Sequence, residues 1–375
     1  MLGGRLDRVG VAAQRPVFAT GGAFIAETRS EVDRYLESAR ARFRPRLQLY
    51  VKAVVAFTLL SGSWAILVLA RPGIVGGVLC LAGLASGMIL VGFCVQHDAN
   101  HGAYFRGRRL NHLMGWTADA LLGFSSYAWR VKHNVAHHTY TNVDGYDDDI
   151  DQTPFARLTP SQRPRCWYRL QHLYIWPLYG LMVLRWQVGA DIAALVRGRI
   201  AQSRLRPPRR WDLAGLVVGK AVFVGWAVVA PLLVYPWWVV ACGYVTVTTV
   251  TSVVTAVTFQ LAHCVEEANT TSPESLTADK RLWAVHEVES TVNFCPHNAV
   301  LTWMLGGLNH QIEHHLFPRV AHTHYPQIAP IVRRNALKHG IRYTAHPSLR
   351  AALRSHQRHL RKLGRTGIAA EIEMG

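Results

Sequence analysis

Acidic residues are scarce in this chain of 375 residues, and so are closely spaced cysteines. Asp and Glu number 23 against 41 Lys and Arg, which gives a formal net charge of +18. None of the six cysteines forms a Cys-x-x-Cys pair, so we interpret them as buried or near-buried thiols in a reducing compartment rather than a disulfide framework. The basic excess predicts an anionic partner, either a nucleic acid or an anionic membrane surface.

The beginning of the chain also lacks the compact apolar run of a secretory signal peptide. Charged residues, including Arg5, Asp7 and Arg15, are spread through it. Insertion into a membrane would therefore depend on an internal apolar segment. We predict residues 1–48 to be a cytosolic arm with a surface helix over about residues 26–43, where charges occur on most faces.

Long apolar segments, by contrast, are abundant. Each approaches the roughly 20 residues that a helix needs to cross the hydrocarbon core. Short joints link the first segment to the second and the third to the fourth, which favours two helical hairpins. The predicted fold class is therefore all-α, an integral membrane protein with four transmembrane helices over about residues 51–70, 74–95, 213–235 and 237–262. The shorter run from Leu173 to Trp186 is expected to lie along the interface or to brace the cytoplasmic part.

All long polar segments fall on one side of the predicted spans. They are the arm, the connection over residues 96–212 and everything after residue 263, whereas the opposite side has two short turns with one arginine, Arg71. The positive-inside rule then places both termini in the cytoplasm of a multi-pass protein of the cell membrane. Core helices of a soluble protein would not explain this asymmetry. Anionic membrane lipids account for the basic excess, so nucleic acid is not needed as a partner.

Eight of the nineteen histidines lie in three short motifs. In the first two motifs, pairs four residues apart share one face of a helix. The third places Gln311, His314 and His315 at positions i, i+3 and i+4, with His310 four residues before His314. The motifs are His97-Asp98-Ala99-Asn100-His101, His133-Asn134-Val135-Ala136-His137-His138 and His310-Gln311-Ile312-Glu313-His314-His315.

Together with His263 at the end of the fourth predicted span, these motifs bring eight or nine imidazoles to one side of the membrane. Neutral imidazole suits Fe, Zn, Cu and Ni, and so many nitrogen ligands can hold two metal ions with open positions. Asp98, Asn134 and Glu313 lie inside the motifs and are predicted to orient the rings. We interpret nine further histidines as exposed or lightly packed: His112, His172, His297, His322, His324, His339, His346, His356 and His359.

Two simpler explanations of the motifs are weaker. A single His-x-x-x-His pair in a histidine-rich chain is more often incidental, but three such motifs on one side of a membrane favour joint metal binding. Residues 310–314 also fit the inverted zinc peptidase motif His-x-x-Glu-His. That interpretation leaves the histidines of the first two motifs unexplained.

The three motifs resemble the histidine boxes of membrane fatty acid desaturases, and the resemblance extends from about residue 50 to 345. The glutamine in the third box is similar to that of the front-end and bacterial branch, which acts on acyl-lipid or acyl-CoA substrates. Similar flanking segments are Thr141-Asn142 with Gly145, Asp147 to Asp149, Phe259 to His263, Asn293-Phe294, Gly306 to Asn309 and Leu316 to Pro318.

This resemblance implies a cytosolic helical cap that holds a non-haem di-iron centre. It implies a desaturase domain over residues 49–345, followed by a basic tail over residues 346–375. Gln311 stands where other branches have histidine, and whether Gln311 or its neighbour His310 supplies a further ligand stays open. The implied iron ligands are His97, His101, His133, His137, His138, His263, His314 and His315.

Two departures from the family pattern matter. Glutamine usually stands at the position of Glu287. The His-Pro-Gly-Gly haem motif of the cytochrome b5 domain that many front-end members carry is absent, and the arm before Val51 is too short for that domain. We therefore expect electrons from a separate donor, such as ferredoxin or cytochrome b5 with its reductase.

The expected reaction is the O2-dependent desaturation of a fatty acyl chain carried by CoA, acyl carrier protein or a lipid. An unactivated CH2 group is inert to acids, bases and nucleophiles, so hydrogen abstraction by an iron–oxygen species is needed. A hydroxylase on the same scaffold is the main alternative, because the boxes do not separate the two outcomes. A haem electron carrier or a metal transporter fits less well, since its ligands would normally lie within the spans.

Overall fold

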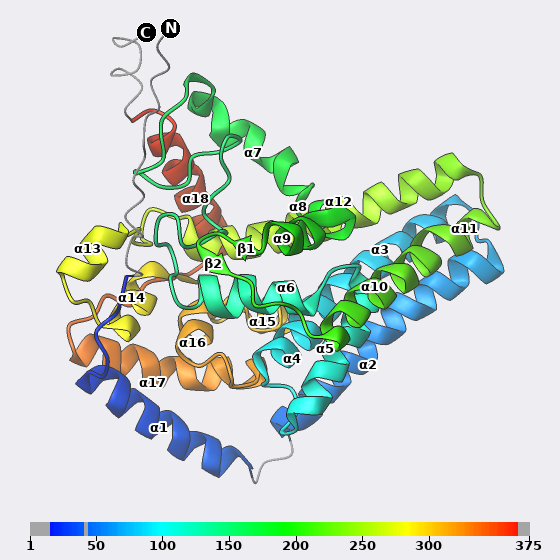
Figure 1. The fold of residues 1–375 in the computed structure, drawn as a ribbon. Helices are drawn as coiled ribbons and strands as arrows, with labels where there is room; N and C mark the ends of the chain where they lie inside the picture. The colour runs from blue at the N-terminus through cyan, green and yellow to red at the C-terminus, as the bar shows by residue number, and fades with distance from the viewer. Residues whose placement is uncertain (1–15, 41–43, 367–375) are drawn as a thin grey trace, which may run out of the picture.

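The computed structural model describes residues 16–40 and 44–366. Figure 1 shows four long helices that run toward the right, while most other helices gather at their left end as a cap. The prediction of an all-α membrane protein with four spanning helices is confirmed. Predictions for residues 1–15, 41–43 and 367–375 lie outside the described residues. The candidate spans are Pro45–Ala70, Ile74–His101, Arg210–Leu232 and Trp237–His263.

Three of the spans contain a short π-helical stretch, in which the backbone coil is wider than in an α-helix. The elements of the spans are α2 (Arg44–Ala65) with η1 (Ile66–Ala70); α3 (Ile74–Leu90), η2 (Val91–Gln96) and α4 (His97–His101); α10 (Arg210–Val224), η6 (Gly225–Val229) and α11 (Ala230–Leu232); and α12 (Trp237–His263).

The first hairpin packs closely because a glycine faces the neighbouring helix. A Cβ atom on Gly87 would lie 2.6 Å from the backbone nitrogen of Leu60, closer than real side chains approach. Small residues permit such close helix contacts in membranes, where packing rather than the hydrophobic effect drives association. Gly87 therefore sets the distance between α2 and α3.

The second span ends later than its apolar pattern predicts. It continues through Gln96 to His101 instead of ending near Val95. The Gln96 side chain is buried, and its Nε2 donates to Asp119 Oδ1 at 2.8 Å. A buried polar group with a partner carries little penalty, so the helix extends past the apolar run. The first histidine motif thus lies at the cap end of a spanning helix.

The connection between the hairpins and the segment after the fourth span build the cap. Among the described residues, β-structure is limited to two isolated bridges and two short pairs: β1 (Arg199–Ile200) antiparallel to β2 (Ser203–Arg204), and β3 (Asn293–Phe294) parallel to β4 (Ala345–His346). The cap helices are α5 (Arg108–Leu122), α6 (Ser126–Arg130), η3 (Val131–His137), η4 (Cys166–Leu170), α7 (Gln171–Tyr179), α8 (Met182–Arg185), η5 (Trp186–Ala190), α9 (Asp191–Arg197), α13 (Pro273–Ala278), α14 (Trp283–Ser290), α15 (Ala299–Met304), α16 (Gln311–Leu316) and η7 (His322–His324).

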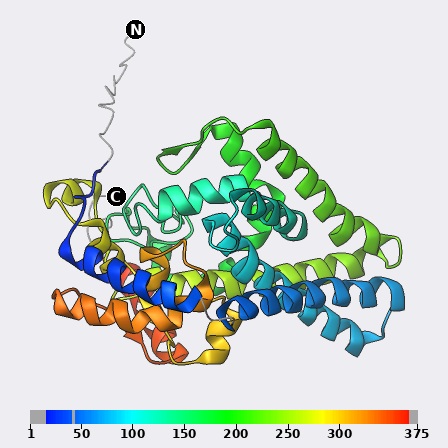
Figure 2. The same cartoon turned by 90° about the horizontal axis from the view of Figure 1, so that it is seen from below.

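Helices near both ends of the chain are packed against the cap. α1 (Ala23–Arg40) lies beside α17 (Tyr325–Lys338), as Figures 1 and 2 show, and Glu27 pairs with Lys338 across them. Within the region predicted as a basic tail, α18 (Leu349–Leu363) packs against α7 and α12. Its buried His356 bonds to the backbone oxygen of Cys264 through Nδ1 at 2.6 Å.

The prediction that all cysteines are buried or nearly so is wrong for two of them. Cys166 and Cys242 are exposed, whereas Cys80, Cys94, Cys264 and Cys295 are buried. Cys166 begins η4 at the surface of the cap, and Cys242 lies on the fourth span. All six are free thiols, as predicted.

Candidate metal centre

The histidine motifs lie on three helical segments whose ends meet in the cap. α4 carries the first motif at the end of its span, and α16 carries His314 and His315. The second motif lies on η3, where the backbone nitrogen of His138 donates to the oxygen of His133 at 2.9 Å. Such i to i+5 bonds define a π-helix, a rare form that is frequent at functional sites.

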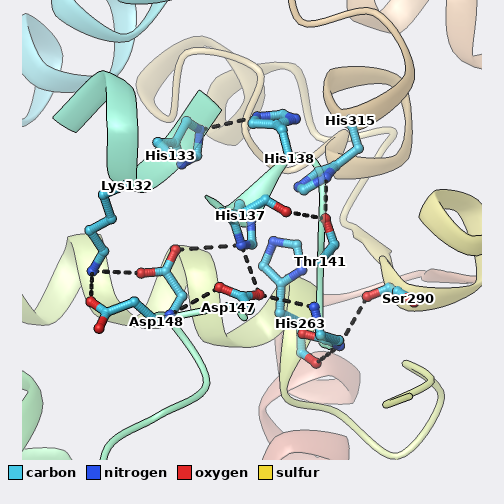
Figure 3. A network of polar contacts seen from close by, with 12 residues as sticks. Lys132, His133, His137, His138, Thr141, Asp147, Asp148, His263, Ser290 and His315 are labelled. Atoms are coloured by element: carbon cyan, nitrogen blue, oxygen red, sulfur yellow. Dashed lines mark hydrogen bonds and ion pairs between the residues drawn. The ribbon is translucent and has the colours of Figure 1, made fainter. Parts of the chain in front are cut away.

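The eight predicted histidines come together in linked groups. Within each group, one nitrogen per ring lies within 4.8 Å of the others. The closest approaches are 3.0 Å from His138 Nε2 to His314 Nε2 and 3.2 Å from His138 Nε2 to His133 Nε2 (Figure 3 shows the latter). The groups are His97, His101, His133 and His314; His137, His263 and His315; His138, His314 and His315; and His133, His137 and Asp149.

Several of these buried ring nitrogens have no hydrogen-bond partner. They include both nitrogens of His97 and of His263, and Nε2 of His101 and of His315. A buried polar group without a partner costs about 1–3 kcal/mol, and a bound metal ion would remove that cost. Imidazole donors suit first-row transition metals. The residues present therefore fit a metal centre, and the linked groups fit two ions.

Buried carboxylates hold the outer nitrogens of two of these rings. Asp147 Oδ2 lies 3.0 Å from His137 Nδ1, a contact visible in Figure 3. Glu287 Oε2 lies 2.8 Å from His315 Nδ1. A hydrogen bond to Nδ1 fixes the ring and leaves Nε2 for a metal. Both rings are thus oriented before any ion binds.

A tight turn after the second motif connects these carboxylates to the rest of the site. Thr141 Oγ1 donates to Glu287 Oε2 at 2.8 Å, and Asn142 N donates to Asp147 Oδ2 at 2.9 Å. Asn142 Nδ2 donates to the backbone oxygen of His263 at 2.8 Å. The Thr141-Asn142 segment therefore ties the second motif to the end of the fourth span.

The third motif is held by the segments that precede it. Asn293 Oδ1 accepts from the backbone nitrogen of Ile312 at 3.0 Å, which satisfies a free amide at the start of α16. Gly306 has φ +57°, and a Cβ there would lie 2.6 Å from the backbone oxygen of Phe93. Glycine is needed at that position because it adopts positive φ and lets the loop approach the second span.

Burial and neighbouring charges shift the pKa values of the cap histidines in different directions. Burial opposes the charged form of His137, but the carboxylates of Asp147 and Asp149 outweigh it and raise the pKa of His137 to about 9. Burial lowers the pKa well below the ordinary value for His133, His138, His314 and His315. These four rings are neutral at physiological pH, the form that binds metal.

The predicted orienting residues do not all contact ligand rings. Asp98 Oδ1 lies 3.7 Å from His97 Nδ1, within ion-pair range. Asn134 Nδ2 instead donates to the backbone oxygen of Asn100 at 3.0 Å. The prediction that Asn134 orients a ring is therefore not supported, because its amide is used to join the first two motifs.

Glu313 and the two candidates for an extra ligand lie at the start of α16. Glu313 accepts from Asn293 and from Tyr343, and its Oε2 lies 3.7 Å from His310 Nδ1. Among the described residues, His310 belongs to none of the candidate metal groups. Gln311 is buried in the first turn of α16, and its role as a ligand stays a prediction.

Several residues of the site were not predicted from their sequence pattern. Asp147 and Glu287 were recognised as flanking positions but not as partners of rings. His286 is fully buried, and its Nε2 lies 2.7 Å from the backbone oxygen of Thr141. Tyr325 places its hydroxyl 3.1 Å from His314 Nδ1. No spacing rule singles out these residues, because they reach the site through tertiary contacts.

The interpretation of the remaining histidines as exposed or lightly packed is wrong for three of them. His322, His346 and His356 are buried. They lie in the basic C-terminal part of the chain, a composition that favours a surface location. Packing of the C-terminal helices against the cap buries them instead.

Three cavities adjoin the histidine cluster or follow one another through the spans. A small cavity of about 40 Å³ has His97, Trp129 and Phe259 in its wall. It shares Met88 with an apolar cavity of about 440 Å³ between the spans. On the cap side it shares Trp129 with a polar cavity of about 370 Å³. The small cavity beside the cluster therefore has neighbours on both sides, one toward the cap and one between the spans.

Comparison with known proteins agrees with this geometry. Residues 72–347 match the fatty acid desaturase family. The chain is 34% identical to an sn-1 linoleoyl-lipid 6-desaturase of Arthrospira platensis, over 92% of this chain and 94% of that protein. It is 32% identical to an sn-1 linoleoyl-lipid 6-desaturase of Synechocystis sp., over 95% and 99%. An acyl-lipid (8-3)-desaturase of Physcomitrium patens is 37% identical over 74% of this chain and 58% of its own length.

The fold and the histidine cluster define a membrane enzyme, and these matches identify its family. The chain belongs to the fatty acid desaturase family and is an oxidoreductase. The resemblance inferred from the three histidine motifs is thus confirmed.

Proposed function

We propose that the chain desaturates a fatty acyl chain carried by a membrane lipid, using O2 and two non-haem irons bound by the histidine cluster. The observation that carries this proposal is the convergence of eight buried histidines in linked groups at the end of the spans. The ligands would be His97, His101, His133, His137, His138, His263, His314 and His315, with Gln311 as a further candidate.

The reaction balances with a separate electron donor. A –CH2–CH2– unit, O2, two electrons and two protons yield –CH=CH– and two molecules of water. When bound, the irons supply the O2-dependent hydrogen abstraction that an unactivated CH2 requires. The electrons would come from a carrier such as ferredoxin or cytochrome b5 with its reductase.

The chain's own residues would position the acyl group. The small cavity beside His97 is walled by Trp129 and Phe259, which would exclude water and hold the reacting carbons close to the cluster. The larger cavity between the spans has an apolar lining that includes Leu84 and Trp226 and suits the methyl end of the chain. Its position inside the membrane matches a long acyl tail.

The polar cavity on the cap side would receive the head of the substrate. Both signs of charge line it, with Lys132, Arg185 and Arg199 alongside Asp148 and Asp191. Such a lining suits a lipid headgroup that offers hydrogen bonds better than the several negative charges of CoA. The relatives named as linoleoyl-lipid and acyl-lipid desaturases support the same carrier.

Expression in a host that supplies a suitable donor, followed by mass spectrometry of fatty acid methyl esters, tests this function. We expect a product lighter than its parent by two hydrogens, and no such product from the His314→Ala variant. An alcohol, heavier by one oxygen, as the sole product would contradict desaturation and establish a hydroxylase.

A further inference from the structure

The four spans contain two lysines, Lys52 and Lys220. A charged side chain within a span is costly and is usually retained for a specific role. Lys220 Nζ donates to the backbone oxygens of Gly123, at 2.9 Å, and Gln187, at 3.0 Å. It also pairs with Asp191 Oδ1 at 3.2 Å, so it joins helix ends, and among the described residues its polar partners do not include the histidine cluster. Lys52 has different partners, and these lead toward the histidine cluster.

Lys52 is the outer member of a buried chain of polar side chains. Its Nζ lies 3.0 Å from His322 Nε2, and His322 Nδ1 lies 2.8 Å from Asp98 Oδ2. The backbone nitrogen of His322 also donates to Asp98 Oδ2, at 3.2 Å. The other oxygen of Asp98 lies 3.7 Å from His97 Nδ1. Lys52, His322 and Asp98 are all at most 3% exposed.

The chemistry of these groups fixes the direction of the chain. An ammonium group has donors but no acceptor, so His322 Nε2 must accept from Lys52. His322 then carries its hydrogen on Nδ1 and donates it to Asp98. The second Asp98 oxygen, at 3.7 Å, is beyond hydrogen-bond distance of His97 Nδ1, but its negative charge still favours a hydrogen on that nitrogen, which leaves Nε2 of His97 for the cluster.

We propose that Lys52 and His322 are positioning residues that, through Asp98, select the ring nitrogen that His97 presents to a metal. This inference rests on the proposed metal centre. Without the lysine, His322 could adopt its other tautomer, with its hydrogen on Nε2. Nδ1 would then have no hydrogen to donate to Asp98, which would keep only the bond from the backbone nitrogen of His322, and its hold on His97 would be weakened.

The surroundings of Lys52 allow a conservative replacement. A cavity of about 250 Å³ is lined by Lys52, His322 and Trp303, and the ammonium lies 5.4 Å from the centre of the Trp303 ring. The larger guanidinium of arginine can extend into this space and still donate. Lys52→Arg therefore preserves the donor, and Lys52→Met removes it at similar length.

The test is metal binding by the purified full-length protein, measured by Co2+ titration and its visible absorption after chelation. We expect Lys52→Met to weaken metal binding by about 10- to 100-fold, the usual effect of losing a group that orients a ligand. Lys52→Arg should bind within a few-fold of the parent. Lys220→Met is the matched control: it should lower the melting temperature but leave Co2+ affinity nearly unchanged.

Two results would overturn the inference. One is Lys52→Met binding Co2+ as tightly as the parent. The other is Lys52→Met and Lys220→Met losing affinity and melting temperature alike, which would make Lys52 structural. Failure of the proposed function is distinguishable, because the parent protein itself would then bind no transition metal.

Discussion

Buried acceptors around the histidine rings define the site at the scale of single residues. Glu287 accepts from Thr141 and faces His315 Nδ1, in the same way that Asp147 faces His137. Such groups orient metal ligands and raise their basicity. Glutamine is the residue that the family resemblance leads us to expect at the position of Glu287, so the contact can be tested with a substitution that keeps an acceptor oxygen.

Glu287→Gln should keep iron binding and product formation within a few-fold of the parent. The amide oxygen of glutamine can still accept from His315 Nδ1. Glu287→Leu removes that acceptor and leaves His315 Nδ1 only the hydroxyl of Thr141, at 3.1 Å, so it should weaken metal binding by about 10- to 100-fold. Iron per chain and product yield would be measured on both variants. Equal damage in the two would show that negative charge, rather than an acceptor, is required.

Sequence patterns locate the histidines of the cluster, but they do not locate the polar groups that orient the histidine rings. The i, i+4 spacing of the first motif is a local property of one helix, and it correctly brings His97 and His101 to one face. The contact between Asp98 and His322 joins residues 224 positions apart. Spacing along the chain carries no information about such contacts, which explains why His322 was expected to be lightly packed.

At the scale of elements, the spans enclose the cavity that would hold the acyl tail. The π-helical η6 in the third span contributes Trp226 and Ala227 to its lining. The spans were predicted from their apolar length, because that property is local. The cavity could not be predicted from the sequence, because it depends on how α3, α10 and α12 pack together.

Ala227→Phe should shorten the acyl chain that the enzyme accepts. The added ring fills part of the cavity of about 440 Å³. Each buried CH2 contributes about 0.8 kcal/mol, so excluding about four of them would lower the preference for the longer chain on the order of 100-fold. Val222→Phe is the control, since Val222 is exposed on the same span and does not line the cavity. Competition between acyl lengths measures the effect, and an unchanged length profile for Ala227→Phe would place the tail elsewhere.

The whole molecule is asymmetric, with its cap and histidine cluster at one end of the spans. The distribution of arginine predicts that this end faces the cytoplasm. Cys166 lies on the cap and is the exposed cysteine outside the described spans, so its labelling can report which side of the membrane the cap faces.

A membrane-impermeant maleimide should label Cys166 in inside-out vesicles and not in sealed right-side-out vesicles. Cys242 lies in the fourth span, where a water-soluble reagent has poor access. Cys166→Ser should abolish the label. Labelling of Cys166 in sealed right-side-out vesicles would reverse the predicted orientation.

The central claim is that the histidine cluster holds two non-haem irons, and metal analysis combined with Mössbauer spectroscopy of the purified protein tests it most directly. We predict two non-haem irons per chain, and their loss in His314→Ala, a variant that still inserts into the membrane. Zinc in place of iron, haem absorbance without non-haem iron, or full iron content in His314→Ala would contradict this account.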